Sequence, residues 1–449
     1  MKPLKIGISG VRGVVGETFT PELVVGFAQA FGTYLGPGRV LVCRDTRPSS
    51  PMVLPAVVAG LLATGCDVVD LGICPTPSLQ LATPWLGADG GISITAGHNP
   101  VQWNALKFVR RDGRYLSPDQ SEELLDLYHQ GRFEKATWDR IPTRVEQGEA
   151  ISHHLDTLAA GFDIEAARAR RLRVAVDCCN GSCSVLAPRW LDMLGCEVLA
   201  TNDDPDAPFP HTPEPRPGTA VQVRAVVKAG RADLGLVHDA DGERLSLVDE
   251  RGRALSEELT LALCVDIVLR ARVGTVVTNV STTMAIERIA SRYGARVVRT
   301  PVGQTYISEA IVEHGAVIGG EGNGSVAVPR VQASHDSAAT TGLIVSHMAA
   351  TRMPLSAMVD ELPRTAMLKE RVAIDPSVIF SVLQGFRDAV QDEPGTAVDL
   401  ADGVKVVFPD GWVHVRVSNT ESMIRLIAEA DTAGRAADLM NWGRHRLGR

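Results

Sequence analysis

Acidic side chains gather in the segment HDADGERLSLVDERG at residues 238–252. Asp239, Asp241 and Glu243 alternate directly after an apolar run, so a looped backbone could turn three carboxylates toward one point. Hard oxygen ligands of this kind suit Mg²⁺, and clustered carboxylates are costly unless a cation compensates them. Arg244 could supply part of that compensation without a metal. The glycine and glutamate positions do not match a calcium-binding EF-hand, so we expect a Mg²⁺ site.

A second candidate is the segment GGISITAGHNP at residues 90–100, an apolar run followed by a polar turn. A turn of small residues that exposes several backbone N–H groups suits phosphoryl transfer. His98 could be a base, an acid or a phosphate donor there, and Lys107 could reach a phosphate or a reacting hydroxyl. The alternative is that these residues have no catalytic role. The sequence Gly-His-Asn-Pro forms turns readily, and a lone Lys usually lies on the surface.

Two more segments carry donors and acceptors suited to a phosphorylated sugar. In GGEGNGSV at 319–326, Glu321 and Asn323 could hydrogen-bond vicinal hydroxyls. In RVSNTESMIR at 416–425, charged and polar donors could surround a dianionic phosphate; they are Arg416, Ser418, Asn419, Thr420 and Arg425. The alternative for the second segment is a capped turn from a strand into a helix. Either interpretation places its donors at the start of a helix.

The elements that would position these loops follow an α/β rhythm. Short β-branched runs alternate with Ala- and Leu-rich helical patterns through three quarters of the chain. This alternation predicts βαβ units and doubly wound, mostly parallel sheets, which bind ligands at the carboxyl ends of their strands. We expect strands at 40–44, 172–177, 232–239, 274–280 and 315–320, and helices at 21–35, 51–65, 256–269 and 282–294.

Three breaks divide the chain, at about residues 130–149, 249–256 and 351–363. The first break is predicted to be a polar linker. After the third, the rhythm changes to the strands of a smaller α+β unit. We therefore expect four domains, each with one loop: residues 1–145 with the reacting-phosphate loop, 146–253 with the metal loop, 254–362 with the sugar loop and 363–449 with the phosphate loop. The three similar α/β units could be a divergent triplication.

Composition limits the classes of protein. The chain of 449 residues is 45% hydrophobic and 22% charged, with a net charge of -8, which indicates a folded protein without general affinity for nucleic acid. We see no signal peptide or membrane span, and the eight cysteines are predicted to be buried and reduced. We expect a cytoplasmic monomer or homodimer whose partner is a small molecule.

The four segments, in this order and at these separations, resemble the α-D-phosphohexomutases, the superfamily of phosphoglucomutase, phosphomannomutase and phosphoglucosamine mutase. Further matches are GISGVRG at 7–13, RDTRPSS at 44–50, LGICPTP at 71–77, VAVDCCNGS at 174–182 and RTPVG at 299–303. The resemblance implies four domains around a central cleft. It also implies interconversion of hexose or hexosamine 1- and 6-phosphates through a 1,6-bisphosphate.

The resemblance also implies residue roles. Asp239, Asp241 and Glu243 would bind Mg²⁺, and the sugar loop with Glu321, Asn323 and Ser325 would read the sugar hydroxyls. The phosphate would bind at Arg416, Ser418, Asn419 and Thr420, with Arg425 adding positive field, and the reacting end would be lined by Arg12, His98, Lys107 and Arg244.

Three positions depart from the family pattern. Gly97 stands where family members carry a phosphoserine, Glu243 replaces an Asp, and Ser325 stands where many members have a His that is a candidate acid or base. If the protein is active, a diffusible hexose 1,6-bisphosphate would supply the phosphate, or His98 would carry it transiently. The alternative is a catalytically impaired sugar-phosphate binder that acts as a regulator or partner subunit. The sugar loop does not select among epimers.

Overall fold

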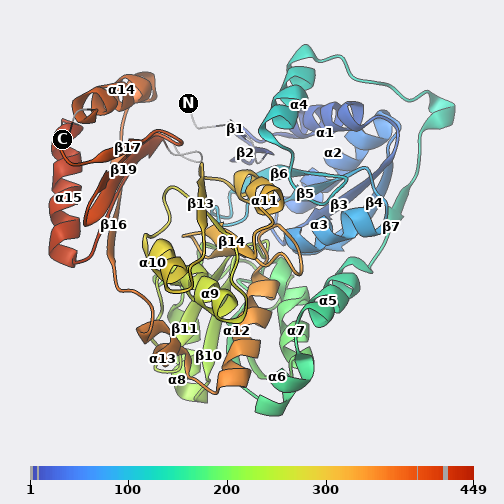
Figure 1. Cartoon of the computed structure of the whole chain (residues 1–449). Helices are drawn as coiled ribbons and strands as arrows, with labels where there is room; N and C mark the ends of the chain where they lie inside the picture. Colours follow the sequence, from blue (N-terminus) through green and yellow to red (C-terminus); the bar gives the residue numbers. More distant parts are fainter. Residues whose placement is uncertain (1–3, 8–9, 392, 418–422, 449) are drawn as a thin grey trace.

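The computed structural model describes residues 4–7, 10–391, 393–417 and 423–448. Within them the strands form four sheets, of seven, four, four and five strands in chain order. Figure 1 shows the corresponding units from blue to red along the chain. Three units are α/β and the last is a smaller antiparallel α+β unit, so the predicted fold class is confirmed.

The first three units repeat one strand order, in which three parallel strands are followed by an antiparallel fourth. The repeats are β4-β3-β5-β6, β9-β8-β10-β11 and β13-β12-β14-β15. Their bounds are β3 Arg39–Arg44, β4 Asp67–Ile73, β5 Gly90–Ile94, β6 Trp103–Arg110, β8 Arg173–Asp177, β9 Glu197–Thr201, β10 Leu234–His238, β11 Leu245–Asp249, β12 Val276–Asn279, β13 Val297–Thr300, β14 Ile318–Glu321 and β15 Ser325–Ala327. Each repeat thus ends in an antiparallel hairpin that the alternation of strands and helices does not reveal, and in the first sheet β2 and β1 extend the sheet beyond it.

The four predicted helices, at 21–35, 51–65, 256–269 and 282–294, are all present, and their ends lie within three residues of the predicted ones. The described helices are α1 Pro21–Leu35, α2 Ser50–Ala63, α3 Thr76–Trp85, α4 Pro118–Gln130, α5 Ala150–Gly161, α6 Ile164–Arg170, α7 Ala187–Met193, α8 Val221–Gly230, α9 Glu257–Ala271, α10 Ala285–Arg292, α11 Gln304–Glu313, α12 Ser337–Thr351, α13 Leu355–Asp360, α14 Ile379–Val390 and α15 Ala433–Arg446. Local chemistry sets the bounds of α1, because Thr20 caps its first turn by accepting from the Leu23 amide and Pro21 occupies the first position.

Helices cover both faces of the first sheet. Val40 and Val42 of β3 pack in the cluster of α1 and α2, whereas the alternate residues Leu41 and Cys43 pack in the cluster that contains α3. This is the period-2 pattern of a strand buried on both sides. The result agrees with a doubly wound unit.

The polar stretch at 130–149 is only partly a linker. Its residues Arg144–Glu146 form β7, which pairs in parallel with β4 and so extends the first sheet. The expected boundary between residues 145 and 146 falls inside this strand. The break at 351–363 likewise contains a short helix, α13.

The smaller unit is an antiparallel sheet in the order β16-β20-β19-β18-β17. Its strands are β16 Ala366–Ala373, β17 Ala397–Asp399, β18 Val404–Phe408, β19 Gly411–Val417 and β20 Met423–Ala430, while β1 Lys5–Gly7 and β2 Gly10–Val14 belong to the first sheet. The expected helix after residue 420 was wrong, because Met423–Ala430 is a strand that pairs with β19. Alternating buried Ile424, Leu426 and Ala428 favour that pairing over a helix.

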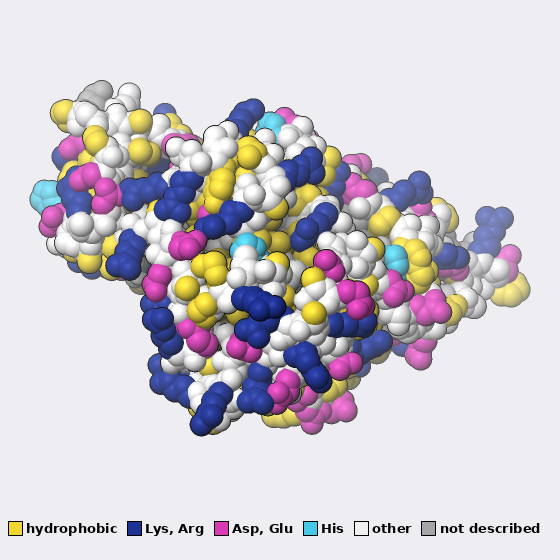
Figure 2. Space-filling view, turned by 60° about the horizontal axis from the view of Figure 1, so that its bottom comes forward, with side chains coloured by type: hydrophobic (Ala, Val, Ile, Leu, Met, Phe, Trp, Pro, Cys, Tyr) yellow, Lys and Arg dark blue, Asp and Glu magenta, His cyan; other side chains and the backbone are white. Residues whose placement is uncertain are grey.

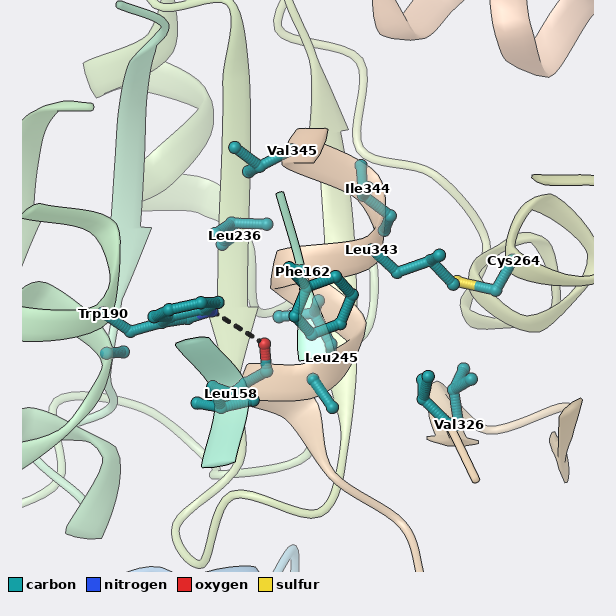
Figure 3. Packing of buried hydrophobic residues seen from close by; sticks show 14 of the residues in the cluster. Leu158, Phe162, Trp190, Leu236, Leu245, Cys264, Val326, Leu343, Ile344 and Val345 are labelled. Atoms are coloured by element: carbon teal, nitrogen blue, oxygen red, sulfur yellow. Dashed lines mark hydrogen bonds between the residues drawn. The ribbon is translucent and has the colours of Figure 1, made fainter. Parts of the chain in front are cut away.

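The second and third units share one apolar core. Trp190 of α7 lies in this core with its ring near that of Phe162, and its indole N–H donates to the Ala338 carbonyl of α12 at 3.0 Å (Figure 3). Because α12 belongs to the third unit and α7 to the second, the two are fixed relative to each other. No described helix is long and apolar enough to cross a lipid bilayer. All eight cysteines are free thiols, and all but Cys196 are fully buried.

The last unit has its own apolar core and meets the third through polar contacts to residues 280–284, which we call the docking loop. Lys405 Nζ donates to the Val280 carbonyl at 2.7 Å, and the Met284 amide donates to the Glu429 carboxylate at 2.7 Å. The Ser281 hydroxyl lies 3.0 Å from Nδ1 of His414. These hydrogen bonds therefore hold the last unit against the docking loop of the third unit.

Lys405 gives this contact a dependence on pH. Burial, with repulsion from Arg299, lowers the pKa of Lys405 to about 7, while its Nζ lies 4.1 Å from the Trp412 ring centre. Above pH 7 the folded state therefore releases a proton that the unfolded chain retains up to about pH 10. We expect Lys405 to contribute more favourably to the free energy of unfolding as pH rises through this range, by at most about 1.4 kcal/mol per pH unit.

The comparison is between wild type and Lys405→Met in urea unfolding at pH 6.5 to 9.5. As pH rises, the free energy of unfolding of wild type should increase relative to that of Lys405→Met. A difference that does not change with pH would contradict the lowered pKa.

Candidate active site

All four candidate loops meet at one cleft of about 610 Å³. The described residues that line it include Arg12, Gly97, His98, Lys107, Asp239, Glu243, Arg244, Glu321, Asn323, Ser325, Arg416 and Arg425. Asp241 lies just beneath, fully buried. Ser418, Asn419 and Thr420 lie outside the described residues. The structure thus brings together the described members of the set that the sequence singled out.

The repeated hairpins explain why the first three loops converge. Each loop joins the carboxyl end of a parallel strand to the antiparallel fourth strand: β5 to β6, β10 to β11 and β14 to β15. The metal loop and the sugar loop also touch, because the Leu245 amide donates to the Gly324 carbonyl at 2.9 Å. A Cβ at Gly324 would lie 2.6 Å from the Leu245 carbonyl oxygen, so only glycine permits this approach.

The backbone at Gly97 is held tightly. Its amide donates to Thr95 Oγ1 at 2.9 Å, and its carbonyl accepts from Arg47 Nη2 at 2.6 Å. Arg47 is buried, pairs with Asp45 at 2.9 Å and also donates to the Asn99 carbonyl at 2.8 Å. Sequence reasoning missed Arg47 as the organiser of this loop, because its contacts lie about 50 residues away along the chain.

Gly97 has φ +53°, in the left-handed region. A Cβ added there would lie 3.3 Å from both carboxylate oxygens of Asp241. The position therefore faces the acidic cluster directly, and it carries no hydroxyl. A residue with a side chain at this position would also have to adopt the strained left-handed backbone conformation.

His98 is a neutral imidazole in a cationic surrounding. Burial, followed by the charges of Arg244 and Arg12, holds the pKa of His98 well below its ordinary value. Arg12 itself is placed by β2 and donates to Asn99 Oδ1 at 3.2 Å. A neutral ring that lines a cleft among cations can act as a nucleophile toward phosphorus.

Lys107 is the cation that meets the carboxylate cluster. Its Nζ, on β6, donates to Asp241 Oδ2 at 2.6 Å and to Glu243 Oε2 at 2.8 Å. Burial alone would lower the pKa of Lys107, but the two carboxylates raise it above its usual value. Arg244, which the sequence suggested for part of this compensation, lines the cleft, and its charge also acts to lower the pKa of Asp239 and of Asp241. The usual surface location of a lone Lys does not apply here, since Lys107 is 7% exposed.

Glu243 joins three units. Its carboxylate accepts from Lys107 and from the Tyr115 hydroxyl of the first unit. The Gln304 amide of the third unit, in the orientation that satisfies its hydrogen bonds, donates to Glu243 Oε1 at 2.9 Å. Both oxygens of Glu243 are therefore bound to protein donors.

Asp239 and Asp241 fit a small hard cation better than Glu243 does. Burial, with the charge of Asp241, raises the pKa of Asp239 well above its ordinary value, and Asp241 Oδ1 is buried without a hydrogen-bond partner. Among the described residues, no three carboxylate, imidazole or thiol groups converge as a metal-binding group. Glu243 would have to exchange its protein partners to become a third ligand.

The sugar loop presents a fixed carboxylate. Glu321 Oε1 accepts from Asn279 Nδ2 at 2.7 Å and from the Gly303 amide at 3.0 Å. Asn323 Oδ1 accepts from the Ser325 amide at 3.1 Å, which orders the turn. Glu321 Oε2 accepts from Asn323 Nδ2 at the longer distance of 3.4 Å.

The cleft contains an imidazole that sequence reasoning did not identify. His335 lines the cleft near the sugar loop, 2% exposed, and its Nε2 has no hydrogen-bond partner. Burial lowers the pKa of His335. Its backbone pairs with Ala327 of β15, two residues from Ser325. Nothing in the local sequence ASHDS marks this residue, because its place depends on that long-range pairing.

Two arginines of the last unit lie side by side in the cleft. Arg416 of β19 and Arg425 of β20 are register partners, and both line the cleft. Like charges directly opposite each other destabilise a sheet, and Asp402 offsets part of this repulsion by accepting from Arg416 Nε. Arg416 Nη2 is buried without a hydrogen-bond partner among the described residues, so this part of the cleft suits an anion. Elsewhere, on the face seen in Figure 2, basic and acidic side chains are interspersed.

Comparisons with known proteins agree with this arrangement. Models of the phosphoglucomutase/phosphomannomutase family match residues 3–135 as α/β/α domain I, 152–252 as domain II, 257–366 as domain III and 382–441 as the C-terminal domain. The chain is 37% identical over 447 residues to a phosphoglucomutase/phosphomannomutase of Thermococcus kodakarensis, covering 97% of each chain. It is 38% identical over 439 residues to a probable phosphoglucosamine mutase of Methanopyrus kandleri, covering 96% of this chain and 95% of that one.

A solved structure shows the same likeness in three dimensions. The crystal structure of a phosphoglucomutase/phosphomannomutase family protein from Burkholderia thailandensis superimposes with a TM-score of 0.86 at 26% identity. The match covers 100% of this chain and 98% of that one.

Lys107 provides a test of the acidic cluster. Lys107→Met would leave Asp241 and Glu243 buried without their cation, so we expect a loss of about 3 to 5 kcal/mol in the free energy of unfolding. Urea unfolding followed by circular dichroism measures it. The matched control is Lys135→Met at an exposed position, which should change stability by less than about 0.5 kcal/mol. Equal stability of the two variants would contradict the assigned pairing.

Proposed function

Because the chain belongs to the phosphoglucomutase/phosphomannomutase family, the α-D-phosphohexomutases, we propose that it interconverts hexose or hexosamine 1- and 6-phosphates through a 1,6-bisphosphate. The observation that carries the proposal is one cleft lined by cationic side chains from both sides of the sugar loop in the chain. Arg12, Lys107 and Arg244 come from the first two units, Arg416 and Arg425 come from the last unit, and the sugar loop lines the same cleft. A hexose with a phosphate on each side matches this charge pattern.

Gly97 cannot carry a phosphoryl group, so the reaction needs another carrier. We assign this role to His98, loaded from a diffusible hexose 1,6-bisphosphate. A ring nitrogen attacks phosphorus, an N–P bond forms, and the P–O bond to the sugar breaks. The proton that the ring gives up goes to the sugar oxygen. The loaded ring then passes its phosphoryl group to the free 6-hydroxyl of a hexose 1-phosphate, whose proton returns to the ring, and a new 1,6-bisphosphate forms. When His98 removes the 1-phosphate of this bisphosphate, the 6-phosphate is released and the ring is loaded again. Arg12, Lys107 and Arg244 stabilise the charge on the phosphoryl group in transit.

Asp239 and Asp241 would hold a Mg²⁺ ion next to the reacting end. The unpaired Oδ1 of Asp241 and the raised pKa of Asp239 support this placement. When bound, the ion would neutralise charge on the phosphoryl oxygens. Glu243 would instead keep Tyr115 and Gln304 in place. The unpaired cysteines favour a reducing compartment, in agreement with a cytoplasmic enzyme.

The missing hydroxyl at Gly97 also favours a second candidate function. A catalytically impaired homologue would bind the sugar phosphate through the same cleft and regulate an active mutase or assemble with one. Such a protein would bind substrate without exchanging phosphate.

A mutase assay separates the two candidates. We expect glucose, mannose or glucosamine 1-phosphate to be converted in the presence of Mg²⁺ and a catalytic amount of glucose 1,6-bisphosphate. Without the bisphosphate, turnover should fall by at least about tenfold, because the enzyme has no stable phosphoryl group of its own. Binding of these sugar phosphates by folded protein with no turnover under either condition would support the binder.

Replacement of His98 tests the carrier. His98→Asn should lower kcat by at least about a hundredfold, since the nucleophile is lost. In that background Gly97→Ser should restore at least about a tenth of wild-type activity, because the strain of a left-handed residue costs only about 1 to 2 kcal/mol.

The matched control is Gly97→Ala with His98→Asn, which has the same backbone strain and no hydroxyl. Equal recovery in the Ser and Ala variants would exclude a serine carrier. Full activity of His98→Asn alone would exclude His98.

A further inference from the structure

Two neighbouring amides before α11 bind carboxylates from two different units. The Val302 amide donates to Asp402 Oδ2 of the last unit at 3.0 Å. The next amide, that of Gly303, donates to Glu321 Oε1 of the sugar loop at 3.0 Å. Both carboxylates lie at the amino end of α11, where the helix dipole favours negative charge. Two consecutive peptide groups therefore link the sugar loop to the last unit.

Asp402 also binds the arginine at the phosphate end. Its Oδ2 accepts from Arg416 Nε at 3.1 Å, and its backbone carbonyl accepts from His414 Nε2 at 2.6 Å. The Arg416 side chain is 6% exposed and that of Asp402 is 20% exposed, so water screens the pair only partly. This bond restrains the orientation of the guanidinium plane, and Nη2 has no hydrogen-bond partner among the described residues. His414 is in turn fixed by Ser281 of the docking loop.

We propose that Asp402 is a positioning residue that orients Arg416 and, through residues 302–303, couples the phosphate end of the cleft to the sugar-reading Glu321. The inference rests on the proposed function, because it takes Arg416 to bind a sugar phosphate. It adds a residue that neither the motifs nor the composition of the cleft singled out. Its consequence is that phosphate and sugar contacts strengthen each other when one ligand makes both.

Electrostatics and positioning make opposite predictions for Asp402. A carboxylate next to a bound phosphate repels it, so charge alone would make ligand binding tighter when Asp402 is neutralised or removed. Positioning predicts weaker binding when the acceptor is removed, since Arg416 then loses the bond that orients it. An amide at position 402 retains an acceptor oxygen without the charge. The two substitutions therefore separate the two effects.

The test is calorimetric titration with glucose 1,6-bisphosphate in EDTA, which prevents Mg²⁺-dependent turnover. We expect Asp402→Ala to bind about tenfold more weakly than wild type. Asp402→Asn should stay within about threefold of wild type, because it keeps the acceptor. Tighter binding by both variants, or unchanged binding by Asp402→Ala, would overturn the proposal.

The matched control is Asp410→Ala, which removes another carboxylate of the same unit that pairs with an arginine, Arg435, and does not line the cleft. This variant should bind like wild type. Equal weakening in Asp402→Ala and Asp410→Ala would overturn the proposal, because the loss would then follow from general damage to the unit. Circular dichroism and the unfolding temperature of each variant identify misfolded protein. If Asp402→Ala misfolds, the comparison of wild type with Asp402→Asn still decides, since clearly tighter binding by Asn would support the electrostatic reading.

A double-mutant cycle tests the coupling to the sugar loop. We combine Asp402→Ala with Glu321→Ala and compare the joint loss of affinity with the product of the separate losses. Coupling through residues 302–303 predicts a deviation of at least about threefold. Additive losses would restrict Asp402 to orienting Arg416 and would overturn the coupling. If wild type binds the bisphosphate but shows no mutase activity, only the proposed reaction fails. If wild type does not bind it, both proposals fail.

Discussion

Two carboxylates of the β10–β11 hairpin, Asp241 and Glu243, are buried against the ammonium group of Lys107 on β6. Neither charge could be buried alone without a cost of several kcal/mol, about the size of a domain's whole stability. The pairing requires the first two units to meet with these hairpins facing each other. Glu243 extends the contact to the third unit through Gln304, so one acidic cluster joins three units, of which the second and third also share an apolar core.

The repeated sheet order places the candidate chemistry on this contact. In each of the first three units the parallel strands end at the same edge, and the antiparallel fourth strand returns the chain past that edge. The turn between them is short and is held by both strands. Three such turns meet at the cleft, and the last unit completes it through hydrogen bonds to the docking loop. The sheets thus carry the loops, while a polar contact holds the unit that brings Arg416 and Arg425 to the cleft.

The reacting end combines opposite charges within one buried volume. Lys107 neutralises part of the acidic cluster, while His98 is kept neutral by burial and by Arg244 and Arg12. A neutral imidazole beside cations keeps its lone pair available, and the cations remain free to attract phosphoryl oxygens. Gly97 lies in the same cleft and has no hydroxyl, so the proposed mutase reaction requires a phosphoryl carrier other than residue 97.

The amino-acid sequence by itself determined the α/β class, the bounds of elements such as α1, and the four loops whose side chains line the cleft, because caps, periodicity and motif chemistry act over a few residues. It misplaced a helix after residue 420, where pairing with β19 outweighs local propensity. Only the tertiary structure decided which groups meet: Lys107 with Asp241, 134 residues apart, His335 in the cleft, and Asp402 with Arg416. Those meetings follow from sheet order and the packing of whole units, which a local pattern of residues does not encode.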